Sequence, residues 1–187
     1  MRKLRIHDKV IWTIGHSTHP IDDFIRLLNS FEIQLVADIR SYPASRRYPH
    51  FIKELLSVSL AENNIEYIHL KDLGGRRKSR PDSTNTGWRL EAFRGYADYM
   101  ETGLFHSSIK ELELIAIEKQ TAYMCSEALW WRCHRSLVSD YLKLNGWKVI
   151  HIMGVGKSDE HSYTQPARIV DGKLIYRKEE HDQLSIP

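Results

Sequence analysis

Hydrophobic residues along the chain follow two patterns, short apolar runs and longer stretches with helical spacing. The short runs are rich in β-branched and aromatic residues and predict strands at residues 10–15, 34–40, 66–70, 120–126 and 147–153. The stretches between them predict a helix starting near residue 20 and further helices at 50–64, 89–101, 107–118 and 134–146. This alternation predicts an α/β fold with a mainly parallel sheet and helices on both faces.

The chain after the fifth predicted strand is polar and is expected to form loops. Within it, residues 167–176 resemble a small β-hairpin around Asp171 and Gly172, a pair that favours a tight turn. No internal repeat and no linker divides the sequence. We therefore expect one α/β domain over residues 1–187, in which residues 154–187 are a C-terminal loop and hairpin extension.

The composition is that of a soluble globular protein, with 42% hydrophobic and 27% charged residues. No apolar run approaches the roughly 20 residues of a membrane-spanning helix, so no membrane partner is expected. The start of the chain is basic and then apolar, but its apolar part is short and lacks a cleavage site, which favours a first strand over a signal peptide. Two cysteines are too few for a disulfide framework, so a cytoplasmic location is expected. The sequence does not indicate an oligomeric state.

Polar and reactive side chains follow each predicted strand directly. The segments concerned are GHST, DIRSYPASRR, HLKDLGGRR, CSEALWWRCHR and HIMG. In parallel sheets the carboxyl ends of the strands lie at one edge, and ligands bind there. The sequence therefore predicts one polar site, assembled from these segments.

Cys125 and Cys133 are the only cysteines, and they flank the segment between the fourth strand and the following helix. A cysteine near a helix start and beside basic residues is expected to have a lowered pKa and to act as a nucleophile, with His134 or His16 as its base or orienter. Cys125 has the alternative role of a buried packing residue. Their spacing fits neither a phosphatase loop nor a thioredoxin motif, and a disulfide between them stays open.

Metal binding is the competing chemistry for these residues. Cys125, Cys133, His134 and His16 offer thiolate and imidazole ligands that suit zinc or iron. Seven residues separate the two cysteines, which is not the spacing of a zinc knuckle. No metal and no cofactor is therefore predicted, and zinc or iron remains the alternative.

His16 and Ser17 lie in the turn between the first strand and the first helix. The backbone N–H groups at such a turn commonly hold an oxyanion or a phosphate, which makes both residues candidates for the site. The alternative is that Ser17 or Thr18 caps the helix.

Asp38 and Arg40 alternate with apolar residues on the second predicted strand, so Asp38 is expected to be buried and paired. Arg40 or Arg135 would supply the partner, in an ion pair that orders the site. General acid–base catalysis by Asp38 or Glu127 is the alternative.

Two predicted loops are strongly basic, although the net charge of the chain is only +3. One loop carries Arg46 and Arg47 between tyrosines, a pattern that suits phosphate contacts and base stacking. The other combines His69 with the glycine pair Gly74–Gly75 and with Arg76. The glycines allow close approach of the backbone or a positive φ, but no nucleotide-binding fingerprint is present. These loops are either solvated surface or the binding surface for phosphate or nucleic acid.

These motifs together resemble the domain-of-unknown-function family 488 (DUF488). The matching segments are TIGHST, LVADIRSYPASRRYPHF, YIHLKDLGGRR and MCSEALWWRCHRSLV, within a core of about residues 10–153. The resemblance implies a compact α/β domain of bacterial or archaeal cytoplasm and no agreed activity, although some members carry a "DNA repair" label. Its signature residues correspond to Gly15, His16, Ser17, Asp38, Arg40, His69, Gly74, Gly75, Cys125, Glu127, Cys133, His134 and Arg135. The chain departs from the family in ALWW, where members often have an acidic-proline segment.

The sequence thus predicts an enzyme, a cysteine-dependent hydrolase or transferase that acts on an anionic substrate such as a phosphorylated small molecule, a nucleotide or a nucleic acid. The predicted catalytic residues are Cys125, Cys133, His134, His16, Asp38 and Glu127. The predicted substrate-binding residues are Ser17, Arg40, Arg46, Arg47, His69, Gly74, Gly75, Arg76 and Arg135. A nucleic-acid-binding module without catalysis and a Cys/His metal protein are the alternatives.

Overall fold

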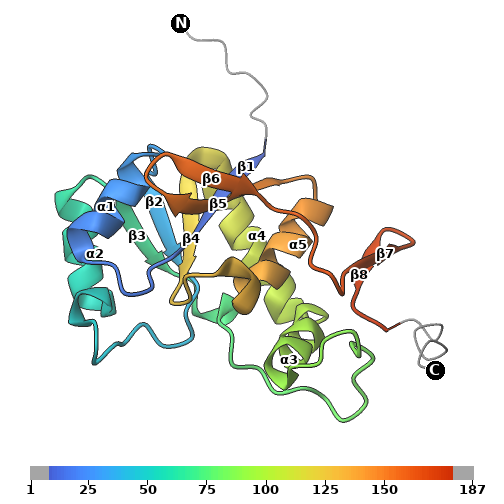
Figure 1. The fold of residues 1–187 in the computed structure, drawn as a ribbon. Helices are drawn as coiled ribbons and strands as arrows, with labels where there is room; N and C mark the ends of the chain where they lie inside the picture. Colours follow the sequence, from blue (N-terminus) through green and yellow to red (C-terminus); the bar gives the residue numbers. More distant parts are fainter. Residues whose placement is uncertain (1–8, 179–187) are drawn as a thin grey trace, which may run out of the picture.

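A six-stranded sheet forms the centre of the molecule in this computed structural model, which describes residues 9–178 (Figure 1). The strands lie in the order β3-β2-β4-β1-β5-β6. Their bounds are Val10–Gly15 for β1, Leu35–Asp38 for β2, Glu66–His69 for β3, Thr121–Cys125 for β4, Lys148–Gly154 for β5 and Lys157–Glu160 for β6. The first five are parallel, and β6 runs antiparallel to β5. The predicted α/β fold with a mainly parallel sheet is confirmed.

Helices cover both faces of the sheet, as Figure 1 shows. The helices are α1 (Ile21–Asn29), α2 (Lys53–Glu62), α3 (Glu91–Met100), α4 (Gly103–Glu118) and α5 (Arg135–Leu144). Helices α1 and α2 pack on one face and α3, α4 and α5 on the other, so the core consists of two apolar clusters separated by the sheet. Successive residues of β4 show this division, since Met124 packs on the α1–α2 side and Tyr123 on the α3–α5 side.

Two local differences from the sequence prediction have simple physical causes. Helix α4 begins at Gly103, earlier than the predicted residue 107, because the Thr102 side chain accepts a hydrogen bond from the Phe105 N–H and caps the helix there. Helix α1 has no side-chain cap, so neither Ser17 nor Thr18 plays that part. The N-cap residue is Pro20, which lacks a side-chain acceptor.

The C-terminal segment is more ordered than a polar loop. Residues 157–160 form β6 at the edge of the sheet, where charged side chains remain exposed, and the predicted hairpin is present as β7 (Arg168–Val170) and β8 (Lys173–Ile175). Buried Asp140 on α5 holds this segment by accepting hydrogen bonds from His161, Thr164 and Tyr176. The segment therefore belongs to the same folded unit as the sheet.

No helix within residues 9–178 is long and apolar enough to cross a membrane.

Candidate functional site

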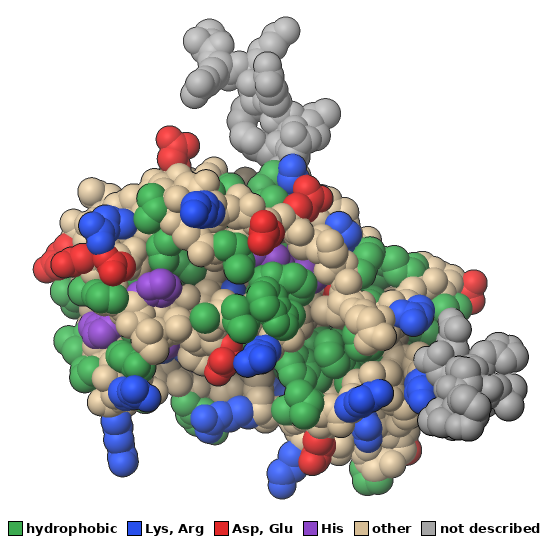
Figure 2. Space-filling model, in the orientation of Figure 1, with side chains coloured by type: hydrophobic (Ala, Val, Ile, Leu, Met, Phe, Trp, Pro, Cys, Tyr) green, Lys and Arg blue, Asp and Glu red, His purple; other side chains and the backbone are tan. Residues whose placement is uncertain are grey.

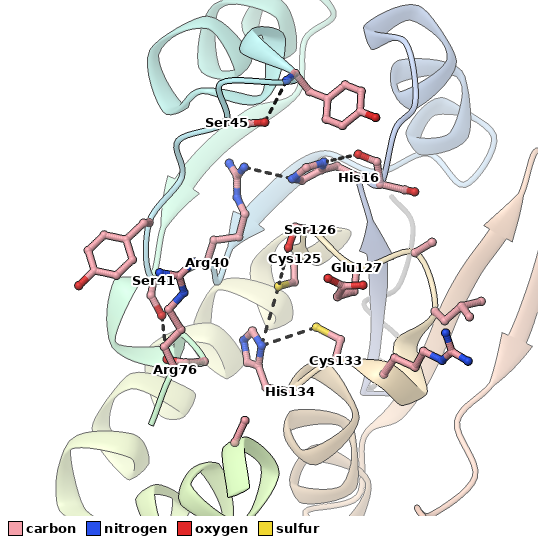
Figure 3. Close-up of a pocket in the computed structure, with 18 of the residues that line it drawn as sticks. His16, Arg40, Ser41, Ser45, Arg76, Cys125, Ser126, Glu127, Cys133 and His134 are labelled. Carbon is pink, nitrogen blue, oxygen red and sulfur yellow. Dashed lines mark hydrogen bonds between the residues drawn. The ribbon is translucent and has the colours of Figure 1, made fainter. Parts of the chain in front are cut away.

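A cavity of about 800 Å³ opens at the carboxyl ends of β1, β2 and β4 (Figure 3). Its walls come from the loops that follow these strands, from Gly75 and Arg76 in the segment after β3, and from the start of α3. Of the residues predicted for the site, those that line it are His16, Ser17, Arg40, Arg47, Gly75, Arg76, Cys125, Glu127, Cys133 and His134. Segments far apart in the sequence therefore meet where a parallel sheet is expected to bind its ligand.

Two sulfur atoms and one imidazole nitrogen face one another in this cavity (Figure 3). The Sγ atom of Cys125 lies 3.8 Å from Nδ1 of His134, and the Sγ atom of Cys133 lies 3.6 Å from the same nitrogen. All three atoms lie within 4.8 Å of one another, and both cysteines are free thiols. Cys125 ends β4, and Cys133 and His134 immediately precede α5. We call these three residues the Cys–Cys–His cluster.

The orientation of the His134 ring is fixed by the backbone. Its Nε2 lies 3.3 Å from the carbonyl oxygen of Ile39 and donates a hydrogen bond to it, which directs Nδ1 at the two sulfurs. Gly75 lies against the ring, and a Cβ atom at this position would lie 2.9 Å from Nδ1. Glycine is thus required at this position for close packing. Of the two roles expected from the sequence, close approach of the backbone and a positive φ, Gly75 has the first.

The two cysteines share one negative charge in the metal-free cluster. For Cys125, the hydrogen bond to Cys133 and burial raise the pKa to about 12. For Cys133, burial acts to raise the pKa, but the hydrogen bond from Cys125 and the positive charge of Arg135 outweigh it and lower the pKa to about 6. The positive charge of Arg135 therefore favours a thiolate on Cys133 over one on Cys125.

Arg135 supplies the compensating positive charge. The residue is 1% exposed, and its guanidinium donates hydrogen bonds to Thr13 Oγ1 at 3.0 Å and to the carbonyl oxygen of Glu127 at 2.6 Å. Within the part of the chain that the structure describes, Arg135 has no carboxylate partner. A buried guanidinium needs a nearby negative charge, and the Cys133 thiolate is the group in position to provide it.

Gly15 allows the loop after β4 to cross directly over the end of β1. A Cβ atom at this position would lie 1.8 Å from the carbonyl oxygen of Glu127 and 2.8 Å from a guanidinium nitrogen of Arg135. The same crossing is held by backbone hydrogen bonds from His16 to Cys125 and from Ser17 to Ser126. Ser17 adopts a positive φ of 47° at this point. The residues of the GHS motif therefore position the loop that carries Glu127.

A hydrogen-bonded network connects the side chains of His16, Arg40 and Asp38 and uses most of their donors and acceptors. The Arg40 guanidinium makes a bidentate ion pair with buried Asp38 and donates further hydrogen bonds to the Phe51 carbonyl oxygen and to Nε2 of His16. His16 in turn donates from Nδ1 to the Ser17 carbonyl oxygen. Tyr67 donates to Asp38 at 2.8 Å. The expected ordering ion pair is present, with Arg40 rather than Arg135 as the partner of Asp38.

Both ring nitrogens of His16 are engaged, so we infer that it orients Arg40 and does not act as a base. Burial and the positive charge of Arg40 lower the pKa of His16 from 6.5 to about 4. The ring is stacked on Phe51 with a centroid separation of 4.1 Å. This environment stabilises the neutral imidazole over the whole physiological range of pH.

We expect NMR spectra to show His16 as a neutral imidazole that takes up its second ring proton only when the pH falls to about 4. Because the unfolded chain takes up this proton near the ordinary His pKa of roughly 6.5, the contribution of His16 to stability is complete above that pH and is lost as the pH falls from there to about 4. His16→Gln should therefore lose less stability than the wild type across this window, measured by urea unfolding. A His16 ring that titrates near pH 6.5 would contradict the assignment.

Five of the predicted site residues do not line the cavity. Asp38 is enclosed by its ion pair, Arg135 is buried against Thr13 and the Glu127 backbone, and Gly74 packs against Ser41, while Arg46 is exposed on its loop. His69 donates from Nε2 to the Arg40 carbonyl oxygen at 2.8 Å. Asp38, Arg135, Gly74 and His69 hold the lining residues in place, so we infer that they position the site without touching a ligand.

Comparison with known protein families finds one family model that matches most of the chain. The family model described as "Domain of unknown function DUF488" matches residues 20–142, which is more than half of the 187 residues. The chain belongs to the DUF488 family. No curated protein and no solved structure matches it.

The DUF488 match contains the whole Cys–Cys–His cluster and the Asp38–Arg40 pair, but it leaves out β1, β5 and β6. His16 and Ser17, which line the cavity, therefore lie outside the matched DUF488 segment. This chain places its GHS motif beside the matched cysteine motif through the parallel pairing of β1 with β4, in which Gly15 is opposite Cys125.

Arg132 is a cavity residue of this DUF488 protein that was not predicted for the site. It ends the short 3-10 helix Trp130–Arg132 and lines the cavity together with Arg47 and Arg76. No carboxylate lies within 4.0 Å of these three arginines among residues 9–178. In the sequence, only its place directly before Cys133 indicated a role for Arg132. The ALWW segment before it has no helical or strand periodicity, so the orientation of the Arg132 side chain could not be predicted.

Proposed function

We propose that this DUF488 protein is an enzyme, a cysteine-dependent hydrolase or transferase that acts on an anionic, phosphate-bearing substrate. The Cys–Cys–His cluster would carry the chemistry, and Arg47, Arg76 and Arg132 would bind the anion. The observation that carries the proposal is that one cavity is lined by both the cluster and these three arginines.

The size and composition of the cavity support a small-molecule ligand. A volume of about 800 Å³ is within the range of roughly 300–1,000 Å³ that is usual for ligand pockets. Tyr42 and Tyr48 line the same cavity, and Arg76 and Arg47 lie over their respective rings at 5.4 Å and 5.5 Å from the centroids. Aromatic rings beside arginines suit a ligand that has a planar group as well as a phosphate, such as a nucleotide.

The charge on the arginines supports an anion as the ligand. Arginine side chains without a carboxylate neighbour keep their hydrogen-bond donors available, and guanidinium groups bind phosphate oxygens in a bidentate geometry. In the view of Figure 2, Lys and Arg side chains outnumber Asp and Glu side chains on the lower half of the molecule. In Figure 1, which has the same orientation, the parallel strands point their carboxyl ends toward this lower half. A ligand with negative charge would therefore be attracted to the cavity side of the molecule.

An extended nucleic-acid surface has less support, because one arginine of the basic loop after β3 is used inside the protein. Arg77 donates hydrogen bonds to the carbonyl oxygens of Gly74 and Asp72, and its guanidinium lies 3.6 Å from the centroid of the Tyr99 ring. Arg77 therefore stabilises the loop after β3. Arg47, Arg76 and Arg132, which have no carboxylate partner among residues 9–178, line a cavity.

Binding of pyrophosphate and of nucleotides, followed by calorimetry, tests the anion site. Arg132→Gln and Arg76→Gln should each raise the dissociation constant about tenfold or more, because each removes a charge-assisted hydrogen bond. Arg26→Gln is the matched control, since Arg26 is exposed on α1 and already paired with Asp23. Absence of binding by the wild type, or equal binding by all variants, would overturn the anion site.

Turnover is tested separately with a panel of phosphomonoesters, phosphodiesters, nucleotides and short oligonucleotides. We expect one class to be converted, and we expect Cys133→Ser to abolish that conversion while leaving the circular dichroism spectrum unchanged. Conversion at the wild-type rate by Cys133→Ser would overturn the cysteine-dependent chemistry.

A further inference from the structure

We propose that the Cys–Cys–His cluster is a zinc site, in which Cys125, Cys133 and His134 are the ligands and the fourth position is open to the cavity. The site would take Zn²⁺ or a similar thiophilic divalent ion. Metal binding does not depend on the proposed function, whereas the use of the ion in catalysis rests on it.

The separations within the cluster are close to those of a tetrahedral zinc site. With Zn–S bonds of about 2.3 Å and Zn–N bonds of about 2.0–2.1 Å, a tetrahedron has S···N edges of about 3.6 Å and an S···S edge of about 3.8 Å. The two S···N distances are 3.6 Å and 3.8 Å, and the sulfurs lie within 4.8 Å of each other.

The imidazole is already oriented as a metal ligand. A ligating histidine usually donates its other ring N–H to a carbonyl or carboxylate, which fixes the tautomer and directs the free lone pair at the metal. His134 does this through the Ile39 carbonyl oxygen, and its Nδ1 is the atom that both sulfurs approach. Within residues 9–178 this is the one group of three His, Cys, Asp or Glu residues placed to share an ion.

The sequence spacing did not predict the site because the ligands come from two different elements. Zinc knuckles place both cysteines on one tight turn, whereas here Cys125 ends β4 and Cys133 lies beyond a loop and a 3-10 helix. Gly15 and Gly75 allow this loop and the His134 ring to approach closely enough for the ligands to converge.

Three protein ligands with access to a cavity are typical of catalytic zinc, whereas structural sites have four protein ligands. The three ligand residues line the cavity, so a water molecule or a substrate oxygen could occupy the remaining position. Glu127 lines the same cavity and makes no ion pair within the described part of the chain, which makes it a candidate to accept a proton from that water. Two thiolates neutralise Zn²⁺, and the buried charge of Arg135 then favours an anion as the fourth ligand.

Titration of the chelator-treated full chain with Co²⁺, followed by displacement with Zn²⁺, tests the site. We expect one ion per chain, sulfur-to-cobalt charge-transfer bands and the visible spectrum of tetrahedral Co²⁺. Cys125→Ser, Cys133→Ser and His134→Gln should each weaken Zn²⁺ binding by about a hundredfold or more. His106→Gln, on the exposed side of α4, is the control and should bind as the wild type does.

Each outcome separates the metal site from the proposed function. Failure of the wild type to bind Co²⁺ or Zn²⁺ at micromolar concentration, or binding that survives all three substitutions in folded protein, would overturn the zinc site. Tight binding of zinc by a protein that binds no pyrophosphate would support the metal site and overturn the proposed substrate class. Pyrophosphate binding with no metal binding would overturn the metal site alone.

Discussion

Arg135→Met should raise the pKa of Cys133 in the metal-free protein by about 1 to 3 units, because it removes the opposite charge that offsets burial. The rate of alkylation by iodoacetamide, measured at each cysteine by peptide mapping, should rise with pH around a midpoint near 6 in the wild type and at a clearly higher pH in the variant. The charge-conserving Arg135→Lys variant should largely restore the low midpoint.

The comparison of the two Arg135 variants separates charge from packing. If Arg135→Met and Arg135→Lys raise the midpoint equally, the guanidinium acts through its hydrogen bonds to Thr13 and Glu127 and not through its charge. A midpoint that stays near 6 in folded Arg135→Met would contradict the claim that the cysteine and the arginine compensate each other. Circular dichroism of both variants shows whether the fold is kept.

Asp38→Ala should lower the free energy of unfolding by about 3–5 kcal/mol, because it leaves the buried guanidinium of Arg40 without its carboxylate. The loss also removes the acceptor of the Tyr67 hydroxyl. Urea unfolding at neutral pH measures the change. Asp23→Ala is the matched control, since it breaks the exposed pair with Arg26 and should cost no more than about 1 kcal/mol.

A loss below about 1 kcal/mol in Asp38→Ala would show that Arg40 finds other partners, and the network around His16 would then not depend on the ion pair. The expected loss, in contrast, would assign Asp38 a positioning role. General acid–base catalysis by Asp38 has little geometric support, because both carboxylate oxygens already accept hydrogen bonds from Arg40.

The sequence was sufficient to predict the five parallel strands of the sheet and the location of the cavity. Both follow from a general property of parallel sheets, since runs of buried residues predict the strands and the polar residues after them must lie at one edge. Cys125, Cys133, His134 and His16 are brought together for that reason. The charged strand β6 was missed because residues 157–160 are exposed at the sheet edge and show no apolar alternation.

The role of each arginine could not be predicted, because it depends on which acceptors the fold brings near. Arg40 and Arg135 follow the same kind of strand exit or helix start as the free arginines, yet both are buried and donate hydrogen bonds to acceptors inside the protein. Arg132 has the same chemistry and lines the cavity. Likewise, the hydrogen-bonded chain Asp140–His161–His151 joins a residue of α5, the residue directly after β6 and a residue of β5. No spacing in the sequence indicates this chain.

Protection of Cys133 by an anion tests most directly whether the sulfur cluster and the arginines form one site. The rate of alkylation of Cys133 in the metal-free protein is measured with and without saturating pyrophosphate. We predict at least a tenfold decrease in the wild type and a much smaller one in Arg132→Gln at the same concentration of pyrophosphate. An unchanged rate in wild-type protein that calorimetry shows to be saturated would contradict the account, because the anion would then bind away from the cluster.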